Sequence, residues 1–138
     1  MMEALQRVGL VYLAQPYSKY PACQRRGISG IRAAFEDGAN LTARMLRAGV
    51  RAYNPISHTH PIAILGGINP LDHLFWLEYD DVMMERCDAL CVAMMATWEH
   101  SIGIGYEIDV FKKAEKPIFY LDPTTMTVTA TAPSGAAS

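Results

Sequence analysis

The segment from Ser101 to Ile108 reads Ser-Ile-Gly-Ile-Gly-Tyr-Glu-Ile and holds the residues best suited to chemistry. Gly103 and Gly105 fall at the start of an expected helix, where each glycine costs about 1 kcal/mol against alanine. Their presence predicts close approach of a ligand to the free N–H groups of a positive helix end, although tight packing of the helix on a strand is the alternative. Glu107 follows Gly103 by four residues, so its carboxylate shares that side of the helix and could reach the ligand.

A second carboxyl and a tyrosine could complete such a site. Asp80 and Asp81 lie in an expected helix, and one of them could point to the carboxyl edge of the sheet, the other to solvent. A carboxylate and a carboxylic acid around one ligand suit glycoside chemistry. Tyr12 lies within an expected strand, where core packing is the alternative to a role in the site.

Polar and aromatic loop residues form a third group of candidates. His58 and His60 alternate, and with His73 or His100 they could suggest a metal site, but no third ligand has a matched spacing. We therefore expect no metal and no cofactor, and we interpret the histidines as ligand-contacting or hydrogen-bonding residues. The remaining candidates for substrate binding are loop residues, of which the last could stack on a base: Gln15, Tyr17, Ser18 and Trp98.

The positions of these loops follow from the apolar runs expected as strands and from the residues that begin and end the expected helices. Buried strands are expected at Val8–Ala14, Val50–Asn54, Asp88–Met94 and Ile118–Leu121. Helices are expected between them: one capped by Ser29 and ended by Gly49, one from Asn69-Pro70 to about Arg86, and one from Ser101 to Glu115. The sequence thus predicts a three-layer αβα fold with a Rossmann- or flavodoxin-like parallel sheet of four to five strands.

In such a sheet, ligands bind outside the carboxyl ends of the strands. That rule selects three loops, Gln15–Gly30, Pro55–Pro70 and Ala96–Gly105. We expect one catalytic domain over residues 1–122 and a Thr/Ala-rich tail over 123–138, in which Thr125–Thr129 could add an edge strand. The helix that ends near Arg86 should turn a set of apolar side chains inward: Leu71, Leu74, Phe75, Val82 and Met83.

Composition limits the partners. The chain has 138 residues, of which 51% are hydrophobic, and a net charge of -2, so a nucleic acid polymer is not an expected partner. No apolar stretch approaches the length of a membrane span, and Met1–Arg7 lacks the apolar core of a signal peptide. Three cysteines without a C-x-x-C motif fit reduced thiols, so a cytoplasmic protein is expected.

Together these motifs resemble the nucleoside 2-deoxyribosyltransferase superfamily, which includes the 2′-deoxynucleoside 5′-phosphate N-hydrolases. The resemblance runs from Val8–Ala14 through Asp80-x7-Asp88-Ala-Leu-Cys-Val and Ser101–Ile108 to Lys116-Pro-Ile. It implies that Glu107 is the nucleophile, that Asp80 protonates the leaving base and that Tyr12 lies near the anomeric carbon. It further implies that Ser101 and Gly103 hold the 5′ end of the sugar.

Three functions remain open. The first is an N-glycosidase acting on a nucleoside 5′-monophosphate, because Ser101, Gly103, Ser18, Lys19, Arg25 and Arg26 could receive phosphate. The second is a deoxyribosyltransferase on unphosphorylated nucleosides, and the third is a nucleotide-binding module without turnover. The resemblance also implies a homodimer or larger oligomer. The apolar runs Phe75-Trp76-Leu77 and Met83-Met84 support the same expectation, because they exceed what one helix face can bury.

Overall fold

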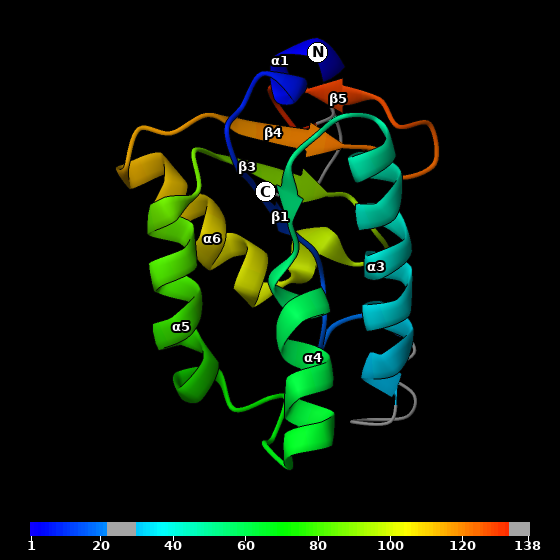
Figure 1. Ribbon diagram of the computed structural model, residues 1–138, viewed down its shortest axis with the longest axis vertical. Coiled ribbons are helices and arrows are strands. Elements are labelled where there is room, and N and C mark those ends of the chain that lie inside the picture. The colour runs from blue at the N-terminus through cyan, green and yellow to red at the C-terminus, as the bar shows by residue number, and fades with distance from the viewer. Residues whose placement is uncertain (22–29, 133–138) are drawn as a thin grey trace.

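A computed structural model describes residues 1–21 and 30–132 (Figure 1). The helices flank a five-stranded sheet. In chain order the elements are α1 (Met2–Gln6), β1 (Val11–Ala14), α3 (Ile31–Arg47), β2 (Ala52–Tyr53), α4 (Pro55–Gly66), α5 (His73–Arg86), β3 (Ala89–Ala93), the 3-10 turn η2 (Trp98–His100), α6 (Ile102–Lys113), β4 (Ile118–Leu121) and β5 (Val128–Thr129). Within the described ranges, no helix combines the length and the apolar character needed to cross a membrane.

The strand order is β2-β1-β3-β4-β5, with β1, β2, β3 and β4 parallel and β5 antiparallel to β4. Every residue of β1 and β3 is buried, which explains why these strands are almost continuously apolar. The strands that follow β1 along the chain lie on both sides of it, β2 on one side and β3 and β4 on the other. The boundary between β1 and β3 is therefore the topological switch point, where α/β sheets bind ligands. The expected α/β fold is confirmed, and so is an edge strand from the tail.

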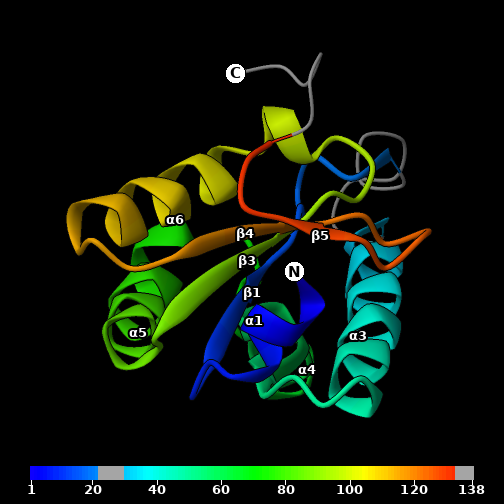
Figure 2. The same cartoon turned by 90° about the horizontal axis from the view of Figure 1, so that it is seen from above.

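Helices cover both faces of the sheet (Figure 2). On one face α1 and α3 bury a cluster that includes Leu5, Leu13 and Met45. On the other face α5 and α6 bury a second cluster around Tyr12 and Phe111. The two clusters together give the three layers, and alternate residues of β1 contribute to each of them.

Three polar side chains fix the ends of α4, α6 and α5, the first two at the carboxyl edge of the sheet and the third at its amino edge. Asn54 caps α4 by accepting from the N–H groups of Ile56 and Ser57. Ser101 caps α6 through the N–H of Ile104 at 3.2 Å. Lys116 donates to the carbonyls of Met84, Glu85 and Cys87 at the end of α5, where a cation also complements the helix dipole.

The segment Pro55–Pro70 was expected to be a loop, and that expectation is wrong for its first part. Asn54 is a cap and Pro55 takes the first position of α4, where its missing N–H has no cost. Pro61 lies inside α4, and Gly67, at φ 69°, ends it. The next helix, α5, begins at His73 with Asp72 as its cap, three residues later than Pro70.

The inward face expected for α5 is also incorrect in part. Leu74, Phe75 and Val82 are all at least half exposed, at 83%, 53% and 50%, while Met84 is buried. Phe75 and Val82 line an open groove beside α4, so α5 carries apolar side chains on more faces than it buries. The cap Ser29 expected for α3 lies outside the described residues, whereas Gly49, at φ 86°, follows the end of α3 as expected.

Candidate functional site

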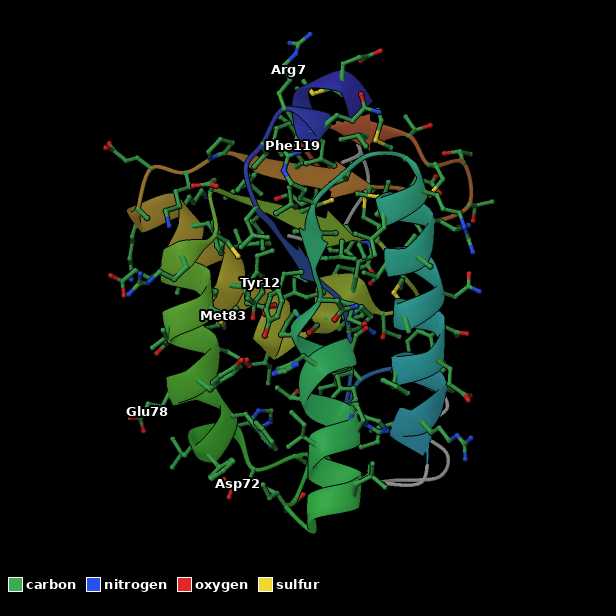
Figure 3. All side chains as sticks on the ribbon, in the orientation of Figure 1. Arg7, Tyr12, Asp72, Glu78, Met83 and Phe119 are labelled. Atoms are coloured by element: carbon green, nitrogen blue, oxygen red, sulfur yellow. The ribbon has the colours of Figure 1, made fainter. Side chains whose placement is uncertain are left out.

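A cavity of about 150 Å³ lies at the carboxyl end of β1, between α4, α5 and α6. Figure 3 shows Tyr12 at the centre of the molecule, whereas Glu78 on α5 points away from it. Seven of the expected site residues meet in the cavity wall: Gln15, Tyr17, Ser18, Asp80, Ser101, Gly103 and Glu107. The lining residues are Gln15, Tyr17, Ser18, Pro55, Ile56, Thr59, Pro70, His73, Trp76, Leu77, Asp80, Met84, Ser101, Gly103, Tyr106 and Glu107.

Glu107 is half-buried on the second turn of α6. Burial raises the pKa of its carboxyl to about 8, the Tyr12 hydroxyl lowers this pKa, and the charge of Asp80 raises it. The coupling to Asp80 means that the two carboxyls, which come from different helices, face a common space. A carboxyl with so high a pKa can hold or release a proton near neutrality.

Asp80 is half-buried on α5, and one of its oxygens, Oδ1, is buried without a hydrogen-bond partner among the described residues. Burial, and then the neighbouring Asp81, raise the pKa of Asp80 to about 6. Asp81 itself is exposed and accepts a hydrogen bond from the Tyr106 hydroxyl at 2.7 Å, which ties α5 to α6. The pair therefore divides as expected: Asp80 faces the cavity and Asp81 the outside.

Tyr12 lies directly behind Glu107. Its side chain is fully buried, and its ring packs against Tyr53 and Phe111 with centroids 5.9 and 5.8 Å away. Its hydroxyl makes no hydrogen bond of regular geometry within the described residues, yet it lies close enough to lower the pKa of Glu107. Burial and the nearby Glu107 and Asp80 charges raise the pKa of Tyr12, so the phenol stays protonated.

Gln15 touches the cavity, but its amide is engaged elsewhere. The Nε2 group donates to the Ala34 carbonyl at 2.9 Å, and Oε1 accepts from Asn54 at 2.7 Å. Gly38 makes room for this network, because a Cβ there would lie 1.7 Å from the Gln15 Oε1 atom. Gln15 thus holds the end of β1 against α3 and α4, a structural role that its loop position did not reveal.

The start of α6 leaves open space beside its glycines. A Cβ at Gly103 would meet only the Ser101 Oγ atom, at 3.8 Å, and a Cβ at Gly105 would meet nothing within 4 Å. Tight packing against a strand therefore does not explain either glycine. Gly103 lines the cavity, whereas Gly105 faces outward and is not part of its wall.

His58 and His60 do not share a face, because both lie in α4 and residues two apart on a helix diverge. His58 stacks on Tyr79, with centroids 5.8 Å apart, outside the cavity. His60 is buried behind Tyr17, whose hydroxyl hydrogen-bonds to the His60 Nδ1 atom. No cluster of three or more His, Cys, Asp or Glu side chains that could hold a metal ion occurs in the described parts of the chain.

Trp98 does not line the cavity. It lies in η2 and packs against Tyr120, with ring centroids 5.9 Å apart, at the border of the second core cluster. Of the basic residues considered for phosphate, Lys19 is exposed and outside the cavity wall. Arg25 and Arg26 lie outside the described residues.

Sequence reasoning did not assign Thr59, His73 and Trp76 to the site. Thr59 lies in Pro55–Pro70, a segment expected near the ligand, but its orientation depends on α4, which the sequence analysis did not predict. Trp76 was expected either in the core or stacked on a base. Thr59 and Trp76 also line an apolar groove of about 480 Å³ between α4 and α5. The aromatic rings of Phe75 and Tyr79 lie along this groove, which adjoins the cavity.

The fold and the site define a class of protein: a doubly wound α/β domain with two coupled carboxyls of raised pKa at its switch point. Residues 9–122 match the family described as "Domain of unknown function (DUF1937)", and the chain belongs to this family. The matched range includes every element from β1 to β4. No curated protein matches the sequence.

Proposed function

We propose that the protein is an N-glycosidase that cleaves the bond between base and sugar of a nucleoside or a nucleoside 5′-monophosphate. The observation that carries the proposal is the convergence of Glu107 and Asp80, both with raised pKa, on one cavity beside Tyr12. The proposal includes a relationship to the nucleoside 2-deoxyribosyltransferase superfamily, which the segments Asp80-x7-Asp88 and Ser101–Ile108 resemble.

The chemistry follows from the two carboxyls. The Glu107 carboxylate attacks the anomeric carbon, and the bond from that carbon to the base nitrogen breaks. The bond's electron pair leaves with the base, which takes a proton from Asp80, so that it departs neutral. A water molecule then attacks the anomeric carbon, gives its proton to Asp80 and releases Glu107 as a carboxylate.

Between about pH 6 and about pH 8, the carboxyls of Asp80 and Glu107 together carry one proton. In the ligand-free site Asp80 ionises first, at about pH 6, and Glu107 retains its proton to about pH 8. The reactive arrangement places that proton on Asp80 instead. A positive charge developing at the anomeric carbon stabilises the ionised form of Glu107, so the reaction itself favours this arrangement.

The volumes of the cavity and of the adjoining groove fit a sugar and a base. The cavity of about 150 Å³ is smaller than ordinary ligand pockets, which span about 300–1,000 Å³, and it suits a sugar ring. The adjoining groove, with Trp76 at the boundary, offers aromatic and aliphatic side chains to a planar base.

Chromatography of free base tests the proposal. The four 2′-deoxynucleosides, the four ribonucleosides and their 5′-monophosphates would each be incubated with the protein, with and without a second base. Release of base supports a glycosidase, and a new nucleoside in the presence of the second base indicates a transferase. Release from no member of the panel would reject both.

A further inference from the structure

Three side chains of the site region, Tyr12, Tyr53 and Asp80, each have a buried oxygen atom that makes no hydrogen bond of regular geometry within the described residues. The two phenol hydroxyls can donate, and the Oδ1 atom of Asp80 can accept. Arg44 of α3 and Ser57 of α4 have unpartnered atoms as well. Buried polar atoms are almost always paired in folded proteins, so a donor and an acceptor that lie close together are expected to meet.

The sheet places Tyr53 on the side of α5 that carries Asp80. Tyr53 ends β2 and pairs in register with Tyr12 of β1, so both side chains leave the same face of the sheet, with ring centroids 5.9 Å apart. Tyr53 packs against the second core cluster, of which Met84 of α5 is a member. Met84 follows Asp80 by four residues, so these two side chains share one face of the helix.

The electrostatics of the two tyrosines agree with this placement. Burial raises the pKa of Tyr53, and Tyr79 and then Asp80 raise it further, so Tyr53 lies close to both of these residues. The Tyr12 hydroxyl lies close to Glu107 and lowers the pKa of that carboxyl. Each tyrosine thus has its own carboxyl partner. Tyr79 does not compete for this contact, because a hydroxyl can donate one hydrogen bond while it accepts another.

A donor at Oδ1 has two consequences for an acid such as Asp80. A protonated carboxyl carries its proton on one oxygen, so an Oδ1 atom that accepts a hydrogen bond leaves the proton on Oδ2. Oδ1 is buried, whereas the Asp80 side chain also lines the cavity, so Oδ2 is the oxygen that can face a ligand. The same donor stabilises the carboxylate that remains after the proton has been transferred.

We infer that Tyr53 is a positioning residue for the general acid: its hydroxyl donates to the Oδ1 atom of Asp80 in the reacting site and keeps the acid proton on Oδ2, toward the leaving base. This role rests on the proposed function, which supplies the base as the acceptor of the proton. The proton passes from Oδ2 to the base nitrogen, and Asp80 becomes a carboxylate. Tyr53 keeps its own proton throughout, because burial raises the pKa of its phenol.

The pKa of Asp80 in the ligand-free protein tests the inference without turnover. NMR would follow the side-chain carboxyl carbon of Asp80, assigned with Asp80→Asn, from about pH 5 to about pH 9. The wild type should titrate at about 6. Tyr53→Phe removes the donor to the carboxylate and should raise this pKa by at least about half a pH unit. The other titratable groups beside Asp80, which are His73 and Asp81 of its own helix and Glu107 of α6, stay unchanged in this variant.

Tyr20→Phe is the matched control, because the Tyr20 hydroxyl donates to Asp37 at 2.6 Å and Tyr20 does not line this cavity. It removes a hydroxyl from another Tyr–Asp pair and should leave the pKa of Asp80 unchanged. A singly fluorinated tyrosine in place of Tyr53, inserted through a suppressor codon, separates a hydrogen bond from a packing role. Its more acidic phenol is a stronger donor, so the pKa of Asp80 should fall rather than rise.

Catalysis gives a second readout on any nucleoside or nucleotide that releases base. Tyr53→Phe should move the acidic limb of the pH profile of kcat/KM upward together with the pKa of Asp80, and it should lower kcat by about tenfold. Tyr20→Phe should change neither quantity.

An Asp80 pKa that is unchanged or lowered in Tyr53→Phe would overturn the inference, as would a rise with the fluorinated tyrosine. The two proposals fail in different ways. Opposite shifts in the two Tyr53 variants without release of base would remove the glycosidase and keep the contact from Tyr53 to Asp80. Release of base with an unshifted Asp80 pKa would remove this inference and keep the glycosidase.

Discussion

Replacing Glu107 by glutamine should stabilise the protein, and the gain should grow with pH. The folded state holds the Glu107 proton to about pH 8, whereas an unburied glutamate has a pKa of 4.5. Above 4.5 the unfolded chain gains stability by ionising while the folded chain does not. The wild type therefore loses stability relative to Glu107→Gln as pH rises, and the loss is complete above about pH 8.

The magnitude follows from the two pKa values. A shift from 4.5 to about 8 corresponds to roughly 5 kcal/mol in the free energy of unfolding at about 1.4 kcal/mol per unit. The side chain is only half-buried, so we expect about 2–4 kcal/mol at pH 9 and less than about 1 kcal/mol at pH 5. For a chain of this size that is a rise in Tm on the order of 10 °C at pH 9.

Thermal unfolding of the wild type and Glu107→Gln, followed between pH 5 and pH 9, provides the measurement. Glu115→Gln is the control for the substitution itself, because Glu115 is exposed and lines neither the cavity nor the groove. If the Tm difference between wild type and Glu107→Gln stays constant over this range, or if the wild type is the more stable protein at pH 9, then Glu107 is not buried as described.

Two further predictions concern catalysis and packing. The pH profile of kcat/KM should be bell-shaped with limbs near pH 6 and pH 8, because Asp80 and Glu107 must share one proton; a profile that is flat from pH 5 to pH 9 would contradict this. Gly38→Ala should lower the free energy of unfolding in urea by about 2–4 kcal/mol, because its Cβ would displace the Gln15 amide from its buried hydrogen bonds. Adding Gln15→Ala to Gly38→Ala should recover part of the loss, and an unaffected Gly38→Ala would refute the close contact.

The parts of the fold that follow short-range rules could be predicted from the sequence. Pro117 cannot continue a helix, so the strand Ile118–Leu121 was placed correctly, and Ser101 was recognised as the residue that opens α6. The segment after Asn54 was misassigned because Pro55, Pro61 and Gly66-Gly67 are typical of loops. Pro55 in fact begins a helix, and Pro61 is tolerated within it.

The sequence predicts those features of the site that follow from spacing along one helix or one strand. It does not predict contacts between side chains of different elements. The face shared by Gly103 and Glu107 follows from helical periodicity. The hydrogen bond from Tyr17 to His60 and the network of Gln15, Asn54 and Gly38 depend on how α3 and α4 pack. Trp98 was expected in the site because it precedes the glycines, but packing on Tyr120 holds it elsewhere.

The most direct test of the central claim is the release of free base by the wild type and Glu107→Gln, measured on the panel of nucleosides and 5′-monophosphates. The proposal predicts release by the wild type and a loss of at least about a thousandfold in Glu107→Gln. Glu115→Gln should be fully active, because Glu115 is exposed and lines neither the cavity nor the groove. Base release that is undiminished in Glu107→Gln, or absent from the wild type on every member of the panel, would contradict it.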